Sequence, residues 1–255
     1  MKERDYKADM HINTTASYEK IFGGIMGLVV GDALGVPVEF LSRNELKANP
    51  VTAMREGGSH NQPKGTWSDD SSMTLCLVDS LNSGLSYNDI ALKFLEWANT
   101  GYMTPYDEVF DIGRTTLAAI RRFAGGTSPL ECGGSSEYDN GNGSLMRILP
   151  LAFYTFGMET KERFEIVHNV SRLTHSHKRS LIACGIYVQL ACELLRGHSK
   201  EKSYHCMIDE CNAIYEGECE LQNFQRIFNG ELQNFKEAEI SSSGYVVDTL
   251  EAALW

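Results

Sequence analysis

A hydroxyl and two neighbouring carboxylates are the first residues in this sequence that could perform chemistry. Ser68, Asp69 and Asp70 stand directly before a predicted helix. Their oxygens suit a hard cation such as Mg²⁺. The same residue types also cap helices, because they accept hydrogen bonds from the first free N–H groups, so capping and metal binding both explain the cluster. The Asp-Asp-x-x-Asp box of helical prenyl synthases does not, since Met73 occupies its fifth position.

Two acidic residues flank an upstream turn that contains glycine and proline. Asp32 lies at the end of a predicted helix and Glu39 lies beyond the turn. We expect Glu39, between Val38 and Phe40, to have an apolar setting. Such a setting raises the pKa of a carboxyl group and suits general acid/base catalysis. An exposed surface carboxylate is the alternative interpretation.

Two downstream stretches could hold a ligand. A Gly/Asn-rich loop opens a predicted helix, and we expect free backbone N–H groups around Asn142, Gly143 and Ser144 to bind an anion such as a phosphate. The loop is not a Walker A motif, since no Gly-Lys-Ser/Thr sequence follows. His175 follows an apolar helix and could stack on a ligand or form a hydrogen bond with it. An ordinary flexible turn and a structural histidine are the alternatives.

Helices are expected to position these residues. Apolar residues at helical spacing predict helices over about 17–33, 70–81, 89–98, 106–123, 145–156, 160–173 and 178–196. Gly23, Gly27 and Gly31 fall on one face of the first helix, where another backbone could approach closely. Loops are predicted over 41–66 and 124–145, where Gly, Pro, Ser and Asn are frequent.

The stretch from 197 to 240 is polar and acidic. Glu-Leu-Gln-Asn-Phe occurs in it twice, at 220–224 and 231–235. Two copies are too few for a solenoid, so we expect a polar helical hairpin or a variable insertion. A last apolar run then leads to Trp255. With no strand signal and no dividing linker, the sequence predicts one all-α domain over 17–255 behind a loose N-terminal arm over 1–16.

Composition excludes several classes of protein. Hydrophobic residues make up 42% of the 255 residues, yet no run approaches the roughly 18 consecutive apolar residues of a membrane helix. A net charge of −11 argues against nucleic-acid binding. The N-terminus lacks the apolar stretch of a signal peptide, so we expect a cytoplasmic location and no membrane partner. The seven cysteines fit reduced thiols, and the spacing of Cys206, Cys211 and Cys219 matches no common zinc pattern.

Five motifs, taken in order, resemble the ADP-ribosylglycohydrolase family, which includes the dinitrogenase reductase-activating glycohydrolases. Their common order argues against chance similarity, and they extend from about Ile21 to Trp255 with an interruption at 197–240. The motifs are G-x-x-x-G-x-x-x-G-D-A-L-G-x-P-x-E-F, W-S-D-D-S-x-M, G-N-G-S-x-M-R, L-T-H and S-S-G-Y-V-x-D-T-L-x-A-A-L-W.

The resemblance implies a single-domain orthogonal bundle of helices with a binuclear Mg²⁺ or Mn²⁺ centre in a cleft. It implies removal of ADP-ribose from a modified protein side chain or from a small molecule that carries ADP-ribose. By motif position, it assigns Ser68, Asp69 and Asp70 as metal ligands and Glu39 as an acid near the reacting ribose; Glu39, Asp69 and Asp70 would form the catalytic group. It assigns binding of ADP-ribose to Asn142, Gly143, Ser144, His175 and Tyr245.

One segment of the family has no counterpart in this sequence. The family completes its metal site with a downstream G-x-D-T-D-T-type segment, whereas Asp248-Thr249 here lacks the preceding acid. We therefore expect a bundle that is incomplete at its C-terminal end, with ligands for at most one ion. The alternatives to an active hydrolase are a truncated or split gene product, a second chain that supplies the remainder, and a non-catalytic ADP-ribose-binding protein or inactive fragment.

Overall fold

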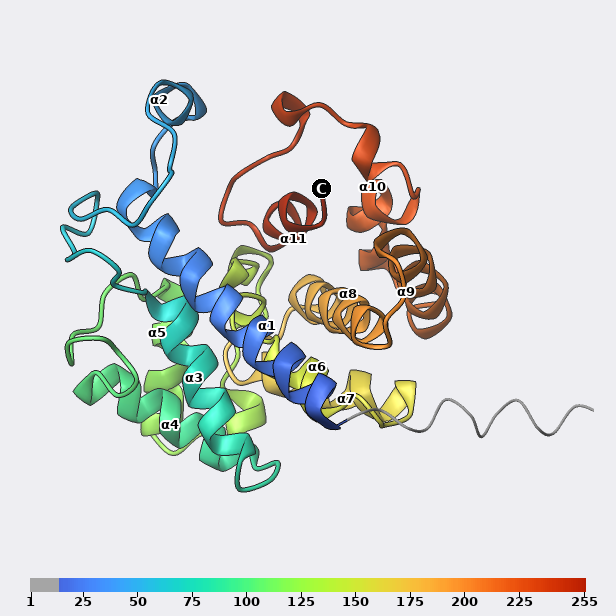
Figure 1. The fold of residues 1–255 in the computed structure, drawn as a ribbon. Helices are drawn as coiled ribbons and strands as arrows, with labels where there is room; N and C mark the ends of the chain where they lie inside the picture. The colour runs from blue at the N-terminus through green and yellow to red at the C-terminus, as the bar shows by residue number, and fades with distance from the viewer. Residues whose placement is uncertain (1–13) are drawn as a thin grey trace, which may run out of the picture.

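Helix α8 (Lys178–Leu195) is the central element of the molecule. The computed structural model describes residues 14–255, so most of the arm predicted over 1–16 lies outside the described residues. Around α8 pack α6 (Pro150–Tyr154), α7 (Thr160–Arg172), α9 (Lys200–Ile214) and α11 (Val246–Leu254), as Figure 1 shows. The faces of α8 that meet these helices bury apolar side chains such as Ile182 and Ile186. The removal of this apolar surface from water is the main driving force for the packing.

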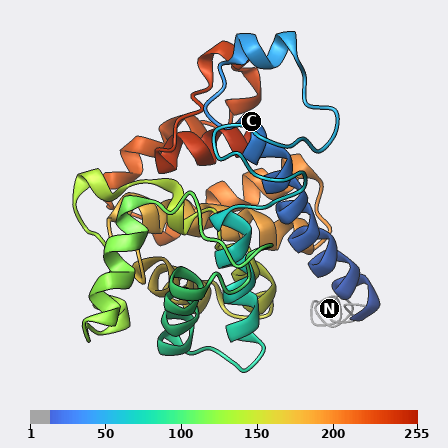
Figure 2. The ribbon, with the colours of Figure 1, turned by 90° about the vertical axis from the view of Figure 1, so that its left-hand side faces the viewer.

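A second layer of helices carries the acidic residues. Helix α3 (Asp69–Leu81) packs against α1 (Thr14–Gly35), α4 (Tyr87–Thr100) and α6, and α5 (Arg114–Ala124) packs on α4. Figures 1 and 2 show α1 lying along one side of the molecule and α2 (Arg43–Ala48) projecting from it. Between residues 14 and 255 there are only isolated β-bridges and no strands. The prediction of an all-α domain is therefore confirmed.

Serine caps fix where several helices begin. The side chain of Ser68 accepts a hydrogen bond from the N–H of Asp70 and starts α3. Ser86 and Ser199 start α4 and α9 in the same way. A cap of this kind satisfies one of the N–H groups that the first turn of a helix leaves without a partner. The N-terminus of α3 is thus set by its own sequence.

Two predicted helices are shorter in the structure. The helix expected over 106–123 begins only at Arg114, because Asp107 and Asp111 adopt left-handed backbone angles, with φ values of 57° and 60°. The helix expected over 145–156 is reduced to α6, which starts with Pro150 at its first turn. Residues 142–144, within the predicted loop, form a 3₁₀ turn. Both corrections leave irregular backbone where the sequence predicted regular helix.

Two stretches predicted as loop or insertion contain helix. Within 41–66, α2 starts at a capping box formed by Ser42 and Glu45, a local signal that the loop prediction overlooked. Within 197–240, α9 packs along α8, while Phe224 and Ile227 are buried in the common core. The short helix α10 (Gln225–Phe228) follows α9. This polar stretch therefore contributes to the core of the domain.

Helix α1 is poorly covered along most of its described length. By length and composition, residues 18–38 could cross a membrane, and only 17% of that window is buried. Tyr18 and Phe22 are 67% and 56% exposed. A Cβ added at Gly23, Gly27 or Gly31 would meet no described atom within 4 Å. The close backbone approach predicted for this glycine face is therefore absent between residues 14 and 255.

Candidate functional site

One cleft of about 730 Å³ gathers most of the residues that the sequence singled out. It lies between the C-terminal end of α1, the N-terminus of α3, the segment before α5 and the loop before α6. Seven of the predicted site residues line it, namely Glu39, Ser68, Asp69, Asp70, Asn142, Gly143 and His175. Ser144 and Tyr245 do not line it. Asp32, Asp111, Arg114 and Thr116 complete its wall without having been assigned from the sequence.

Asp32 joins α1 to the start of α3. Its carboxylate accepts hydrogen bonds from the backbone N–H of Ser68 (2.9 Å) and of Ser71 (3.1 Å). The hydroxyls of Ser68 and Ser71 also donate to it, at 2.8 and 2.6 Å. The Ser68 hydroxyl, predicted as a metal ligand, is thus already occupied by Asp32 and by its capping role. Four donors on one carboxylate hold the acidic end of the cleft in a fixed geometry.

Asp69 and Asp70, when ionised, have no partner of opposite charge in an ion pair among the described residues. Burial, followed by the neighbouring charge of Asp70, raises the pKa of Asp69 well above its usual value. Burial, followed by the charges of Asp32, Asp111 and Glu39, raises the pKa of Asp70 to about 7. Neither carboxylate forms an ion pair with a Lys, Arg or His between residues 14 and 255. This uncompensated charge favours a bound cation.

Glu39 meets two residues that the sequence did not indicate. The Nε2 atom of His60 lies 2.6 Å from Glu39 Oε2 and 3.9 Å from Asp111 Oδ1. Burial and then the charge of Glu39 raise the pKa of Asp111 to about 6. The apolar setting predicted for Glu39 is wrong, because Phe40 is 78% exposed and His60 is the contacting side chain. His60 and Asp111 were missed because each comes from a distant loop.

Another part of the cleft wall is built around His175. Burial lowers the pKa of His175 to about 3, so its ring is neutral at physiological pH. The Thr174 hydroxyl lies 2.8 Å from His175 Nδ1 and accepts from Arg147 Nη2 at the same distance. Arg147 also donates to the carbonyl oxygen of Gly143. The buried guanidinium of Arg147 therefore fixes both the histidine and the loop in front of it.

Gly143 stands where a side chain would not fit. A Cβ at this position would lie 2.8 Å from His175 Cε1 and 2.9 Å from Thr116 Oγ1. The backbone of Gly143 is thereby brought against the ring of His175. The neighbouring Asn142 N–H donates to the carbonyl oxygen of Gly244 at 3.0 Å, so this N–H is not free for an anion as predicted. The loop is held by Gly244 and Arg147, and Asn142 and Gly143 line the cleft.

Ser144 and Tyr245 lie behind the cleft wall. Ser144 is fully buried, and its hydroxyl accepts from the hydroxyl of Ser171 at 2.9 Å. Tyr245 forms an isolated bridge with Gly141, and its hydroxyl accepts from Arg179 Nη1 at 3.4 Å. Both residues support the loop from behind and do not face the cavity.

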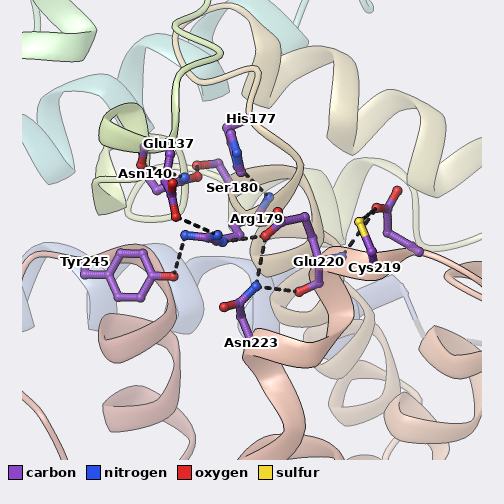
Figure 3. Close-up of polar contacts among 10 residues, drawn as sticks. Glu137, Asn140, His177, Arg179, Ser180, Cys219, Glu220, Asn223 and Tyr245 are labelled. Carbon is purple, nitrogen blue, oxygen red and sulfur yellow. Dashed lines mark hydrogen bonds and ion pairs between the residues drawn. The ribbon is translucent and has the colours of Figure 1, made fainter.

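Arg179 connects three separate segments behind this loop, as Figure 3 shows. Its guanidinium donates to Glu220 (2.5 Å), to Glu137 (3.0 Å) and to Tyr245. Asn223 donates to the same carboxylate of Glu220 at 2.9 Å. Arg179 therefore ties the polar stretch 197–240 to the loop over 124–145.

Comparisons with known proteins match most of the chain to one family. The sequence profile of the ADP-ribosylglycohydrolases matches residues 13–255. An ADP-ribosylarginine hydrolase, Tri1, of Serratia proteamaculans is 32% identical over 96% of this chain and 63% of its own length. Tri1 of Pseudomonas putida is also 32% identical, over 91% of this chain and 60% of its own length. The chain thus spans about three fifths of these two curated relatives.

Two further proteins extend the comparison. The ADP-ribosyl-[dinitrogen reductase] glycohydrolase of Rhodospirillum rubrum is 30% identical over 93% of this chain and 73% of its own length. A solved structure described as an ADP-ribosylglycohydrolase-related protein complex superposes with a TM-score of 0.75 at 29% identity. It covers 94% of this chain and 76% of the other. The sequence matches and the structural superposition therefore point to the same family.

Proposed function

Because this chain belongs to the ADP-ribosylglycohydrolase family, we propose that its cleft binds an ADP-ribosyl group and hydrolyses the bond between that group and a modified side chain. The observation that carries the proposal is the division of the cleft into two ends. Buried carboxylates without ion-pair partners line one end, and the neutral His175 with its glycine loop lines the other. The first end suits a cation and a reacting ribose, the second the rest of the ligand.

We propose that the acidic end holds a divalent cation, Mg²⁺ or Mn²⁺. Asp69 and Asp70 would be its ligands, since their carboxylates are buried close together and lack ion-pair partners among the described residues. Hard divalent cations prefer such oxygen ligands. When bound, the cation would act as a Lewis acid on the ribose hydroxyls and on a neighbouring water. Ser68 would support it indirectly, through Asp32.

The remaining acids would handle the protons of the hydrolysis. A water oxygen forms a bond to the anomeric carbon of the ribose as the bond to the side-chain nitrogen breaks, through an oxocarbenium-like transition state. Glu39, oriented by His60, would take the proton from the water. Asp111, with a pKa of about 6, can release a proton near neutral pH and would supply one to the leaving nitrogen.

The other wall would hold the phosphates and the second half of the ligand. Arg114 is the only Lys or Arg of the described chain that lines the cleft, and it stands at the N-terminus of α5. Its charge and the helix N-terminus would both favour a pyrophosphate. Gly143 and His175 would contact the distal ribose and base from the opposite side.

We propose arginine as the modified side chain. The two relatives at 32% identity are ADP-ribosylarginine hydrolases by name. The carboxylates that line the cleft would also attract a cationic guanidinium group. The partner of this chain would accordingly be an ADP-ribosylated protein.

Release of ADP-ribose from an ADP-ribosylated arginine peptide tests the proposal. We expect release with added Mg²⁺ or Mn²⁺, loss of release with a chelator, and loss in Asp69→Asn. The exposed Asp209 on α9 provides a matched control, since Asp209→Asn should leave release unchanged. Calorimetry with ADP-ribose separates hydrolysis from binding. Binding without release under every metal condition would refute the hydrolase and support an ADP-ribose-binding protein.

A further inference from the structure

A second group of metal-ligand side chains lies at the far end of α8 from the cleft. Glu193 on α8, His198 before α9 and Cys206 on α9 place an oxygen, a nitrogen and a sulfur within 4.8 Å of one another. Glu193 lies about four turns, or about 22 Å, along α8 from Lys178 at its start. We propose that these three residues, the α8–α9 triad, bind a zinc ion.

The spacing within the triad suits tetrahedral zinc. Bonds of about 2.0 Å to nitrogen and oxygen and about 2.3 Å to sulfur place neighbouring ligand atoms about 3.3–3.6 Å apart. His198 Nδ1 lies 3.1 Å from Glu193 Oε2, slightly inside that range. The Cys206 sulfur lies within 4.8 Å of both other ligand atoms, so it would have to move closer to them when zinc binds.

The ligand types separate this site from the cleft. A thiol, an imidazole and one carboxylate form the mixed set that zinc accepts, whereas Mg²⁺ prefers oxygen ligands only. The side chain of His198 is 26% exposed, which gives an ion access from solvent. The fourth position is open to water.

Hydrogen bonds orient the buried carboxylate of Glu193. Its Oε1 atom accepts from Gln189 Nε2 at 2.8 Å and pairs with Arg196. Gln189 itself accepts from the buried Arg163 at 2.9 Å. These partners occupy Oε1 and leave Oε2 directed to His198, in the way that outer hydrogen bonds orient metal ligands.

The charges of the triad also favour zinc. An ionised Glu193 and a Cys206 thiolate carry two negative charges, which one Zn²⁺ neutralises. The Arg196 side chain is 37% exposed, so it can turn toward solvent when the ion binds. The ion pair with Arg196 accounts for the buried carboxylate of Glu193, but it does not involve the thiol of Cys206. The ion would fasten the end of α8 to α9 across the turn at Gly197, where φ is 84°.

Cobalt substitution of the reduced, chelator-treated chain tests this proposal, with excess Mg²⁺ present to fill the cleft. We expect one equivalent of Co²⁺ to give thiolate charge-transfer absorption and the d–d bands of tetrahedral cobalt, and Zn²⁺ to displace it. Zinc at a hundredfold excess over its Kd should raise Tm by about 5–10 °C. Cys206→Ser should weaken zinc binding by at least about 100-fold.

Matched variants make the outcome decisive. The exposed Cys219 lies outside the triad, so Cys219→Ser should keep the cobalt spectrum and the zinc affinity. His60→Ala should keep them as well, because His60 contacts Glu39 of the cleft and not the triad. His198→Ala, at a partly exposed position, repeats the test should Cys206→Ser fail to fold by circular dichroism. The proposal is overturned by an absent thiolate band, by a band that survives Cys206→Ser, or by zinc binding that His60→Ala abolishes.

Discussion

The substitution Asp70→Asn should stabilise the metal-free chain at neutral and alkaline pH. In the unfolded chain an aspartate loses its proton near its ordinary pKa of 3.8, whereas folded Asp70 keeps it up to about 7. Folding is therefore opposed by this group increasingly as pH rises from about 4 to about 7, and by a constant amount above that. Asparagine removes the charge while keeping the size and shape of the side chain.

The size of the effect follows from the shift in the pKa of Asp70. A rise from 3.8 to about 7 corresponds to about 4 kcal/mol of folding free energy at 1.36 kcal/mol per pH unit. Asp70 opens onto the cleft, where water screens part of the repulsion, so we expect a measured gain of roughly 2–4 kcal/mol. For a chain of this length that gain raises Tm by about 4–16 °C.

The assay compares thermal unfolding of the two proteins from about pH 5 to about pH 9 in chelator. The comparison must be a difference between proteins, because burial lowers the pKa of His168 to about 4 and that of His175 to about 3. These histidines make both proteins more stable as pH rises from about 4 to about 6.5, against the trend from Asp70. Subtracting one curve from the other removes their contribution.

Added Mg²⁺ completes the test. It should raise the Tm of the unsubstituted chain, most strongly above about pH 7, and should have little effect on Asp70→Asn. Asp209→Asn should behave as the unsubstituted chain does in both conditions. The reasoning fails if Asp70→Asn destabilises the metal-free chain above pH 7, or if its advantage does not grow with pH.

Three further predictions concern the walls of the cleft. Gly143→Ala should weaken ADP-ribose binding by about tenfold or more in calorimetry, because its Cβ would lie 2.8 Å from the His175 ring. Gly141→Ala, whose Cβ would meet only Gly244 O at 3.9 Å, is the control, and equal losses would contradict the steric argument. His60→Gln should lower kcat of the proposed hydrolysis by about tenfold with little change in KM, because it orients Glu39; a change confined to KM would point to substrate binding instead. Arg179→Met should lower the free energy of unfolding by about 2 kcal/mol in urea, whereas Lys178→Met, which removes a 60% exposed partner of Glu218, should change it by less than about 0.5 kcal/mol. Similar values for the two variants would show that the contacts of Arg179 do not hold the loop.

Local sequence signals predicted the helices whose ends depend on adjacent residues. Apolar periodicity placed α3 and α4 within two residues of their observed starts, where Ser68 and Ser86 cap them. The same reasoning failed over 106–113, where Asp111 adopts a left-handed backbone angle that apolar spacing does not reveal. Its carboxylate faces Glu39 and His60, which are brought to it only by the tertiary fold.

The same contrast between local sequence signals and tertiary contacts applies to the site residues. Motif order placed Glu39, Asp69 and Asp70 together, and the structure puts all three on the cleft wall. Motif position gives no information on depth, so Ser144 and Tyr245 were assigned to the ligand although both lie behind the wall. Residues that act through contacts across the fold, such as His60, have no neighbour in the sequence that could indicate them.

Helix α1 combines a tightly held polar end with an exposed apolar face. Its C-terminal end carries Asp32, which four donors hold against α3, while its exposed face carries Phe22, Met26 and Val30. A helix of 22 residues is a stiff rod about 33 Å long. A partner that binds to the apolar face and tilts α1 would therefore displace Asp32 and change the spacing of the carboxylates beside it. The cation affinity of the cleft would then depend on whether a partner is bound to the apolar face of α1, which lies outside the cleft.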